Sequence, residues 1–450
     1  MSLTLRLATT GSRTTPRVPL LSSGANHPAH GRLTGLVALV LVIATPLAIA
    51  FHYVARAYFH AGYPWDTFLV NPTWHFNDFY LPYVEAQKFH PGSSGSMVYS
   101  PVLHLLMTAM TAVPASVAFA AVVAVFLGVL VSIVWRWITA SDEAWSSRAQ
   151  TTAILVLLSY PVLFVLDRGN LEMVVFILLA LFFWLYYARG SRWAWIPLAL
   201  AIAGKYYWVT LLVLLLSDRN VRQAVLAFAG AVASTLLAAA ALAATSGYSA
   251  VEVLRNTMTT LSARGGGLRG ALDIQHAHTL WSVVQVLNRL TGYSISSLPH
   301  LTTGYFAIAA LLFALVAYNV LSRDLEPWRK VTVLVAATLV LPFESFDYTL
   351  LHLYFPLAVI VCTAVPCRAS RATVWLLAVC LAPAAYYYFV FSGFRLDVGV
   401  SVLLYGTCLG ALLIVPLVGA GDRRLSWRSL LVWSGDEDAR WRRVEDRGGV

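Results

Sequence analysis

Charged side chains are scarce in this sequence, and acidic ones are the scarcest. Asp, Glu, Lys and Arg together make up 12% of the 450 residues, and the first acidic residue is Asp66. Soluble globular domains carry roughly 25% charged residues, so the composition argues against that class. The hydrophobic share is 59% and the mean hydropathy is +0.71. The sequence therefore predicts an integral membrane protein.

Cysteine is rare as well. The four cysteines occur near the C-terminal end of the sequence, at Cys362, Cys367, Cys380 and Cys408. Their spacing fits neither a metal site nor a disulfide framework, so we interpret them as packing residues in or beside apolar runs. A Gly-rich phosphate loop that follows a strand is also missing, which argues against a nucleotide-binding site of that kind.

Long apolar runs are what the sequence has in abundance. Runs of roughly 18 to 22 residues recur along nearly the whole chain, and each can cross a bilayer as a helix. The alternating pattern of a membrane barrel is absent. We predict an all-α polytopic bundle of about 12 transmembrane helices over residues 34–420. Residues 1–33 are predicted as a disordered, basic cytoplasmic tail and residues 421–450 as a charged cytoplasmic tail.

The positions of Lys and Arg set the orientation of the helices. Short cytoplasmic loops carry the positive excess in membrane proteins, so the net charge of +10 is interpreted as orientation and not as nucleic-acid binding. Both termini are then cytoplasmic. The spans expected on this basis cover residues 34–56, 115–135, 151–166, 223–244, 302–321, 331–343, 349–365, 372–390 and 399–418, together with a re-entering span that reaches Arg189, an outer loop over 245–300 and an interfacial segment at 101–113.

The stretch between Arg192 and Asp218 needs a special arrangement. One straight helix would place the basic cluster at 218–222 outside, against the positive-inside rule. A break at 204–207 makes a hairpin of two short helices, which returns the cluster to the cytoplasm and leaves Lys205 near the outer end. Broken helices at membrane depth line protein or wet cavities. We therefore favour the hairpin over the straight helix and expect a site at the break.

Ionisable and amide side chains gather on the outer side of this topology. Such groups are costly at membrane depth, so a cluster of them indicates function. We expect a cavity there that binds a substrate. The candidates are Asp66, Asp78, Glu85, Arg168, Asn170, Lys205, Arg264, Arg269, Asp273, His276, His278, Glu344, Asp347 and Arg395.

Several motifs occur in order among these candidates: 77–83 followed by Glu85, then 99–101, 168–171, 201–208 with Lys205, and 345–348. They resemble the Asp-Phe-x-x-Tyr-Tyr, Tyr-x-Pro-Pro, Gly-x-x-Asn, Ala-x-x-Lys-x-x-Pro and Ser-Trp-Asp-His elements of the GT-C membrane glycosyltransferases that use polyprenyl-phosphate sugars. The resemblance is closest to the actinobacterial α-mannosyltransferases that act on phosphatidylinositol mannosides and related lipoglycans. It covers roughly residues 35 to 365.

The sequence departs from the family pattern at three positions. Trp208 replaces the hairpin proline, Ser100 replaces the first proline of the Tyr-x-Pro-Pro element, and Tyr348 replaces a histidine. His352 lies one helical turn beyond Tyr348 and is a candidate substitute for that imidazole; the alternative is a histidine that is hydrogen-bonded for structure alone.

The resemblance implies an inverting transfer of a sugar, most simply an α-mannosyl group, from a polyprenyl-phosphate donor to a glycolipid or lipoglycan on the outer face of the plasma membrane. A lipid-linked donor suits that face, because nucleotide sugars are cytoplasmic. Asp78 is expected to act as the general base. Donor-phosphate binding is assigned to Lys205, Arg168, Arg264 and Arg269, and sugar or acceptor binding to Asn77, Tyr80, Glu85, Tyr99, Asn170, His278, Ser345 and Asp347. Neither a metal ion nor a cofactor is expected, and the partners are donor, acceptor and membrane lipids, without nucleic acid.

Each main assignment has a structural alternative. Asp78 fits a cap of the helical segment that follows it. Lys205 fits a side chain that snorkels to the interface, and Arg168 fits a partner of its neighbour Asp167. The segment 264–269, with three consecutive glycines, fits either a substrate-gating loop or a plain flexible loop. His276 and His278 resemble a metal-binding pair, but no third ligand has a useful spacing.

Other functions also suit a polytopic chain. Arabinofuranosyl transfer uses the same lipid-carrier chemistry as mannosyl transfer. A secondary transporter or flippase also contains broken helices, but the similarity between halves that is typical of transporters is not found in this sequence. A non-catalytic membrane component would require neither Asp78 nor Lys205.

Overall fold

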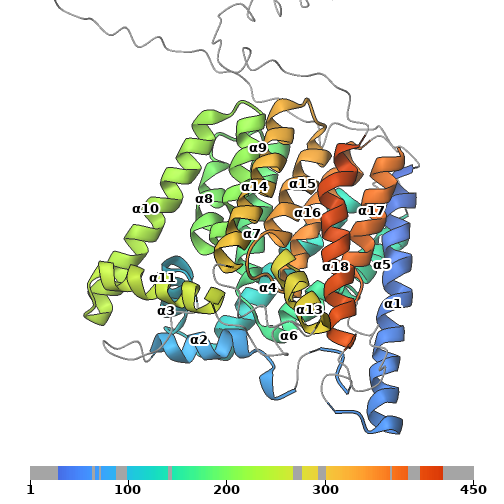
Figure 1. Cartoon of the computed structure of the whole chain (residues 1–450), viewed down its shortest axis with the longest axis horizontal. Coiled ribbons are helices and arrows are strands. Elements are labelled where there is room, and N and C mark those ends of the chain that lie inside the picture. Colours follow the sequence, from blue (N-terminus) through green and yellow to red (C-terminus); the bar gives the residue numbers. More distant parts are fainter. Residues whose placement is uncertain are drawn as a thin grey trace, which may run out of the picture.

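The computed structural model of the chain describes residues 29–62, 66–69, 72–87, 99–139, 144–266, 276–291, 301–364, 367–383 and 396–418. Every regular element in these ranges is a helix, and one isolated β-bridge joins Ala277 to Phe346. Most helices run side by side in one bundle, and α2 and α11 lie across one end of it (Figure 1). The tails predicted at 1–33 and 421–450 lie outside the described residues, except that the first helix already begins at Ala29.

The first half of the bundle contains these elements: α1 Ala29–Phe59, η1 Pro72–Trp74, α2 Asn77–Gln87, α3 Pro101–Met110, α4 Ala115–Ile133, η2 Val134–Ile138, α5 Trp145–Leu157, α6 Tyr160–Arg168, α7 Glu172–Phe183, η3 Trp184–Ala188, α8 Trp195–Gly204, η4 Tyr206–Leu211 and α9 Leu212–Ser217. The second half contains α10 Val221–Ser246, α11 Ala250–Gly266, α13 Leu280–Thr291, α14 Leu301–Ser322, α15 Pro327–Val340, η6 Asp347–Leu353, α16 Tyr354–Thr363, α17 Arg368–Leu381, α18 Leu396–Ile414 and η7 Val415–Leu417.

Four helices in the described part of the chain are long and apolar enough to cross a membrane. They are Leu33–Phe59 in α1, Ala115–Ile138 in α4 with η2, Val221–Ser246 in α10, and Thr303–Ser322 in α14. The bent pair α5 and α6 makes a fifth if it counts as one span, and the other apolar helices have 10–17 residues. In the described residues the protein is all-helical and has long apolar helices consistent with a polytopic membrane protein, but the expected number of about 12 spans is not confirmed.

The core of the bundle lies around α15. All residues from Trp328 to Val340 are buried, as expected for a helix that is apolar on every side. By contrast, α10 and α14 expose large apolar side chains such as Phe228 and Leu311 on their outward faces. Such faces suit contact with lipid. Because α15 is central, the segment that follows it, 341–348, is placed in the interior of the molecule.

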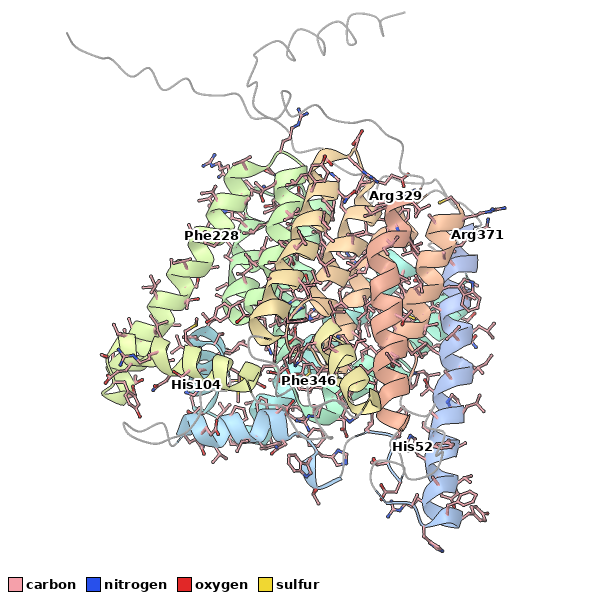
Figure 2. The ribbon with its side chains drawn as sticks, viewed as in Figure 1. His52, His104, Phe228, Arg329, Phe346 and Arg371 are labelled. Carbon is pink, nitrogen blue, oxygen red and sulfur yellow. The ribbon has the colours of Figure 1, made fainter. Side chains whose placement is uncertain are left out.

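The bundle has two chemically different ends. We call the end with α2 and the α6–α7 turn the Asp78 end, and the end with the α14–α15 turn the Lys330 end. Arg329 and Arg371 lie at the Lys330 end, whereas Phe346 and His104 lie toward the Asp78 end (Figure 2). At the Lys330 end, Lys330 Nζ binds Asp218 Oδ1 at 2.6 Å. The ion pair joins the start of α15 to the end of α9.

The span expected at 151–166 is bent. Helices α5 and α6 meet at an angle of 51°, where the straight helix was predicted. The cause is Pro161 in the first turn of α6, because proline lacks the backbone N–H that a continuing helix needs and restricts the residue before it. The bend turns α6 so that its C-terminal end, at Arg168, contacts α2.

The hairpin between 192 and 218 is confirmed by its contacts. Tyr186, near the end of α7, donates a hydrogen bond of 2.8 Å to Asp218, at the end of α9. At the start of α7, Glu172 lies 3.5 Å from Lys205, which follows α8. The chain therefore runs along α8 toward the Asp78 end, turns at Lys205, and returns through η4 and α9 to the Lys330 end.

The outer loop predicted over 245–300 is partly helical. It contains α11, with Glu252 in its first turn, and α13. Long apolar runs do not indicate these helices, because α11 is a polar helix that lies across the bundle end (Figure 1). Gly265 and Gly266 belong to the end of α11, so only part of the predicted glycine loop remains a loop candidate.

Candidate functional site

The site is built where the start of α2 packs on the turn between α6 and α7. The backbone N–H of Phe76 donates to the carbonyl oxygen of Asp167 at 2.7 Å, and His75 Nδ1 pairs with the Asp167 carboxylate. Gly169 ends α6 with φ +65°, a left-handed conformation that suits glycine. A Cβ at Gly169 would lie 3.1 Å from Phe76 Cα and from Phe79 Cβ. The missing side chain therefore permits the close approach.

This packing places Asp78 between two donors. Arg168 binds the carboxylate through two nitrogens: Nη2 pairs with Oδ1, and Nε donates to Oδ2 at 3.2 Å. Asn170 Nδ2 donates to the same Oδ2 at 2.7 Å. The side chains of Asp78 and Arg168 stay 16% and 22% exposed. A substrate can therefore reach both groups.

A second carboxylate, Glu172, lies two residues after Asn170 and is completely buried. His352 Nε2 lies 2.7 Å from its Oε1, and the Tyr207 hydroxyl donates to both oxygens at 3.0 and 3.1 Å. Lys205 Nζ lies 3.5 Å from Oε2. Burial of a charge requires such partners, and here two donors and one cation supply them.

Asn170 joins the two carboxylates. Its Nδ2 donates to Asp78, and its Oδ1 accepts the backbone N–H of Glu172 at 2.9 Å. Tyr99 adds a second link: its hydroxyl donates to the Asp78 carbonyl oxygen at 2.9 Å, and the ammonium of Lys205 lies 5.5 Å from its ring centre. Lys205 and Asp78 are thus held by neighbouring contacts in one network.

A third carboxylate, Asp347, is buried beside the first two. Its oxygens accept from Tyr160 at 3.2 Å and lie 3.1 Å from His278 Nδ1. His278 Nε2 lies 3.1 Å from Ser345 Oγ on its other side. The backbone bonds of the β-bridge, including Asp347 N–H to the His276 carbonyl at 2.7 Å, fix the segment before α13 against the start of η6.

Two side chains connect the Asp347 cluster to the rest of the site. Tyr348 interacts electrostatically with Asp78, Glu344 and Glu172. Burial lowers the pKa of His276, Asp347 opposes this effect, and the positive charge of Arg168 adds to the decrease. The three carboxylates and their cations therefore form one electrostatic unit.

The structure brings most of the predicted site residues together. The residues that share the network are Asp78, Tyr99, Arg168, Asn170, Lys205, His278, Ser345 and Asp347. Asn77, Tyr80 and Glu85 are partly buried on the same helix as Asp78. Arg264 lies near the end of α11, but its side chain falls outside the described residues, as does Arg269, and Asp273 and Arg395 lie outside them too.

The contacts decide between some of the alternatives. Arg168 pairs with Asp78, whereas Asp167 pairs with His75. Asp78 is the second residue of α2, and its carboxylate binds the side chains of Arg168 and Asn170, so these contacts do not make it a backbone cap. His352 is buried against Glu172, which favours the structural interpretation of that histidine.

Sequence reasoning missed Glu172, together with its partner Tyr207. Glu172 was counted as part of a span, because it stands at the head of a long apolar run. A signal was available: the fourth residue of the Gly-x-x-Asn element, counted from Gly169, is Glu172. A carboxylate at this amide position, with a lysine in the following hairpin, indicates an ion pair.

Comparison with known proteins gives one match. Residues 98–342, more than half of the chain, match the family model of glycosyltransferase family 87. The matched region includes Tyr99, Arg168, Asn170, Glu172 and Lys205, whereas α2 and its carboxylate precede it. Neither a curated protein nor a solved structure matches the chain.

Proposed function

The chain belongs to glycosyltransferase family 87, and on this premise we propose that it moves a sugar, most simply an α-mannosyl group, from a polyprenyl-phosphate donor to a glycolipid or lipoglycan acceptor. The reaction inverts the anomeric centre, so a β-linked donor gives an α product. The active site is the network at the Asp78 end.

One observation supports this assignment most strongly. A partly exposed carboxylate, Asp78, shares one network with two partly exposed cations, Arg168 and Lys205. Transfer from a sugar phosphate requires this combination. A base must accept the proton of the acceptor hydroxyl, and fixed cations must stabilise the phosphate that leaves.

The chemical step is a direct displacement. The acceptor oxygen attacks the anomeric carbon, and the bond between that carbon and the phosphate oxygen breaks with its electron pair on the phosphate. The acceptor proton passes to Asp78. The Arg168 fork and Asn170 orient the carboxylate before the acceptor arrives. Nε and Nη2 of Arg168 make the fork, so Nη1 remains for the phosphate.

The other groups bind the substrates. Lys205 is 20% exposed and supplies a mobile positive charge for the phosphate. Asp347, His278 and Ser345 are fixed by one another, so they form a rigid wall that orients sugar hydroxyls. Asn77 and Tyr80, both partly buried on α2, contact the acceptor together with Glu85 further along the same helix.

We place the Asp78 end on the outer face of the plasma membrane. Basic residues supply the support, because cytoplasmic ends carry the positive excess. Arg329 and Arg371 lie at the opposite end (Figure 2). At that end Arg219 lies in the turn before α10, and Arg222 lies in the first turn of α10. On this orientation the donor enters from the outer leaflet, and both termini are cytoplasmic.

A transfer assay with purified protein in liposomes tests the proposal. Labelled polyprenyl-phosphate mannose is supplied with extracted glycolipid acceptors, and wild type is compared with Asp78→Asn. We expect the variant to lose a factor of at least about 100 in rate, because removal of a general base costs that much or more. Asp66→Asn is the matched control, and it should keep the wild-type rate.

Other outcomes would change the proposal. Normal transfer by folded Asp78→Asn would assign the base to another carboxylate, with Glu85 and Asp347 to be changed next. Transfer only from an arabinofuranosyl donor would correct the sugar. Absence of sugar transfer by the wild type with every lipid-linked donor would overturn the proposed reaction.

A further inference from the structure

Glu172 cannot touch a substrate in this structure. Its side chain has no exposed surface, whereas Asp78, Arg168 and Lys205 are all partly exposed. Yet Glu172 is the anion next to the proposed phosphate-binding lysine, at 3.5 Å. A buried ion pair is expensive to maintain, and replacing both partners by well-packed apolar side chains is often neutral or stabilising. Its presence beside a reactive site therefore calls for a functional explanation.

Lys205 is held loosely compared with the other partners of Glu172. The distance of 3.5 Å is longer than those from His352 and Tyr207, which are 2.7 and 3.0 Å. Glu172 therefore keeps two hydrogen-bond partners if the ammonium moves away. Lysine carries its charge on a flexible stem, so a short movement toward an incoming anion is easy. The tyrosine ring of Tyr99, 5.5 Å from the ammonium, provides a second surface that favours a cation.

We propose that Glu172 is the resident counter-ion of Lys205, that the donor phosphate displaces it during binding, and that it draws Lys205 back when the lipid phosphate product leaves. This inference rests on the proposed function, because it assumes that Lys205 binds the donor phosphate. Glu172 is a positioning residue, since it acts only through Lys205.

The charges of donor and product explain why such a counter-ion is useful. The donor is a phosphodiester with one negative charge, and the product is a phosphate monoester that carries up to two. The site therefore binds the product more strongly than the donor when only the cations act. A carboxylate that competes for Lys205 weakens the hold on both, and it offers the ammonium a partner at the moment of release. Glu172 thus favours turnover over tight binding.

The test removes the charge and keeps the shape. Glu172→Gln should bind polyprenyl phosphate about tenfold more tightly, because the anion that competes for Lys205 is removed; a tenfold change in Kd corresponds to about 1.4 kcal/mol. The Kd for polyprenyl phosphate in nanodiscs is measured directly. In steady-state transfer, the KM for the donor and kcat should both fall. A merely structural role would lower kcat without tightening the binding of the lipid phosphate.

Three further variants identify the source of the effect. In a Lys205→Met background, Glu172→Gln should leave the Kd for polyprenyl phosphate unchanged, because the effect acts through the lysine. His352→Gln removes a partner of Glu172 but leaves the negative charge of Glu172 in place, so the Kd for polyprenyl phosphate should stay near that of wild type. Glu172→Asp lengthens the distance to Lys205 and should tighten binding by a smaller factor; it also serves as the test if Glu172→Gln does not fold.

The failures are distinguishable. Unchanged or weaker binding of polyprenyl phosphate by folded Glu172→Gln would overturn the counter-ion inference, even if the wild type transfers sugar and Lys205→Met does not. An equal effect of Glu172→Gln in the Lys205→Met background would also overturn it. Absence of transfer by the wild type would instead remove the proposed function on which the inference rests.

Discussion

At the scale of single residues, the pair of Asp78 and Arg168 defines the chemistry of the site. From the sequence, Asp78 is expected to act as the base and Arg168 as a phosphate ligand, but in the structure the two side chains bind each other. Both roles remain compatible, because a guanidinium has five N–H donors in a planar fork and the pair uses only part of them. The shape of arginine is therefore as important here as its charge.

This dependence on shape leads to a prediction for Arg168→Lys. A lysine keeps the charge but cannot bind the carboxylate through two parallel hydrogen bonds. We expect the rate of sugar transfer to fall by about 10- to 100-fold, which corresponds to the loss of about 1.4 to 2.7 kcal/mol in the transition state. Arg222→Lys, at the Lys330 end, is the control and should retain the wild-type rate. Equal activity of Arg168→Lys and wild type would contradict the importance of the fork.

At the scale of elements, the site depends on the contact between α2 and the α6–α7 turn. Gly169 permits this contact for two reasons: its backbone adopts a positive φ, and it has no Cβ that would clash with α2. The hydrogen bond from Phe76 to Asp167 and the ion pairs that Asp167 and Arg168 make with residues at the start of α2 all follow from the same close approach. A change in this turn is therefore expected to disturb Asp78 without touching it.

Gly169→Ala should destabilise the protein by about 1 to 3 kcal/mol, because it combines a left-handed backbone strain with contacts of 3.1 Å to Phe76 and Phe79. Thermal unfolding in detergent measures the loss, and transfer activity should fall with it. Gly128→Ala is a matched control, since nothing lies within 4 Å of a Cβ at that position in α4. That substitution should leave stability the same or slightly raise it.

The elements also show what the sequence reveals and what it hides. The break at Gly204–Lys205 was predictable, because two full spans do not fit between Arg192 and Asp218 and the basic cluster fixes the parity. The gathering of Asp78, Arg168 and Lys205 followed from the same topology. Such reasoning assigns side chains to a side of the membrane, and this sufficed to predict that these three residues lie at the same end of the bundle.

Contacts between distant segments were beyond the reach of the sequence. Glu172 appears as the polar start of a span, and only the packing of η6 against α7 shows that His352, 180 residues later, is its partner. The bend between α5 and α6 was missed for a different reason. An apolar run indicates that a segment prefers lipid, whereas the direction of a helix after Pro161 depends on what it packs against.

At the scale of the whole molecule, the two ends of the bundle differ in their charged side chains. The Asp78 end combines carboxylates with cations in a buried network. The Lys330 end carries the exposed Arg219, Arg222 and Arg371 and the ion pair of Lys330 with Asp218, which joins the start of α15 to the end of α9. Membrane proteins place the positive excess in the cytoplasm, so this asymmetry predicts the orientation of the entire bundle.

Cysteine labelling in intact cells checks the orientation. After the four native cysteines are replaced by alanine or serine, a cysteine is introduced at Trp74, which is 53% exposed at the Asp78 end. A membrane-impermeant maleimide should label Trp74→Cys in intact cells and label Arg222→Cys only after lysis. The reverse pattern would place the site in the cytoplasm and would require a different donor.

The central position of α15 has a consequence for biosynthesis. This helix is buried on every side, yet it is made only after α1 to α14 have left the ribosome, and η6 and α16 follow it still later. Before α15 is inserted, the earlier helices lack the helix that packs at their centre. Glu172, at the start of α7, likewise lacks its partner His352 until η6 is made. Nascent chains of this kind are vulnerable to misassembly and depend on chaperones. The buried contacts of Glu172 with His352 and of His278 with Asp347 can therefore form only after η6 has been inserted.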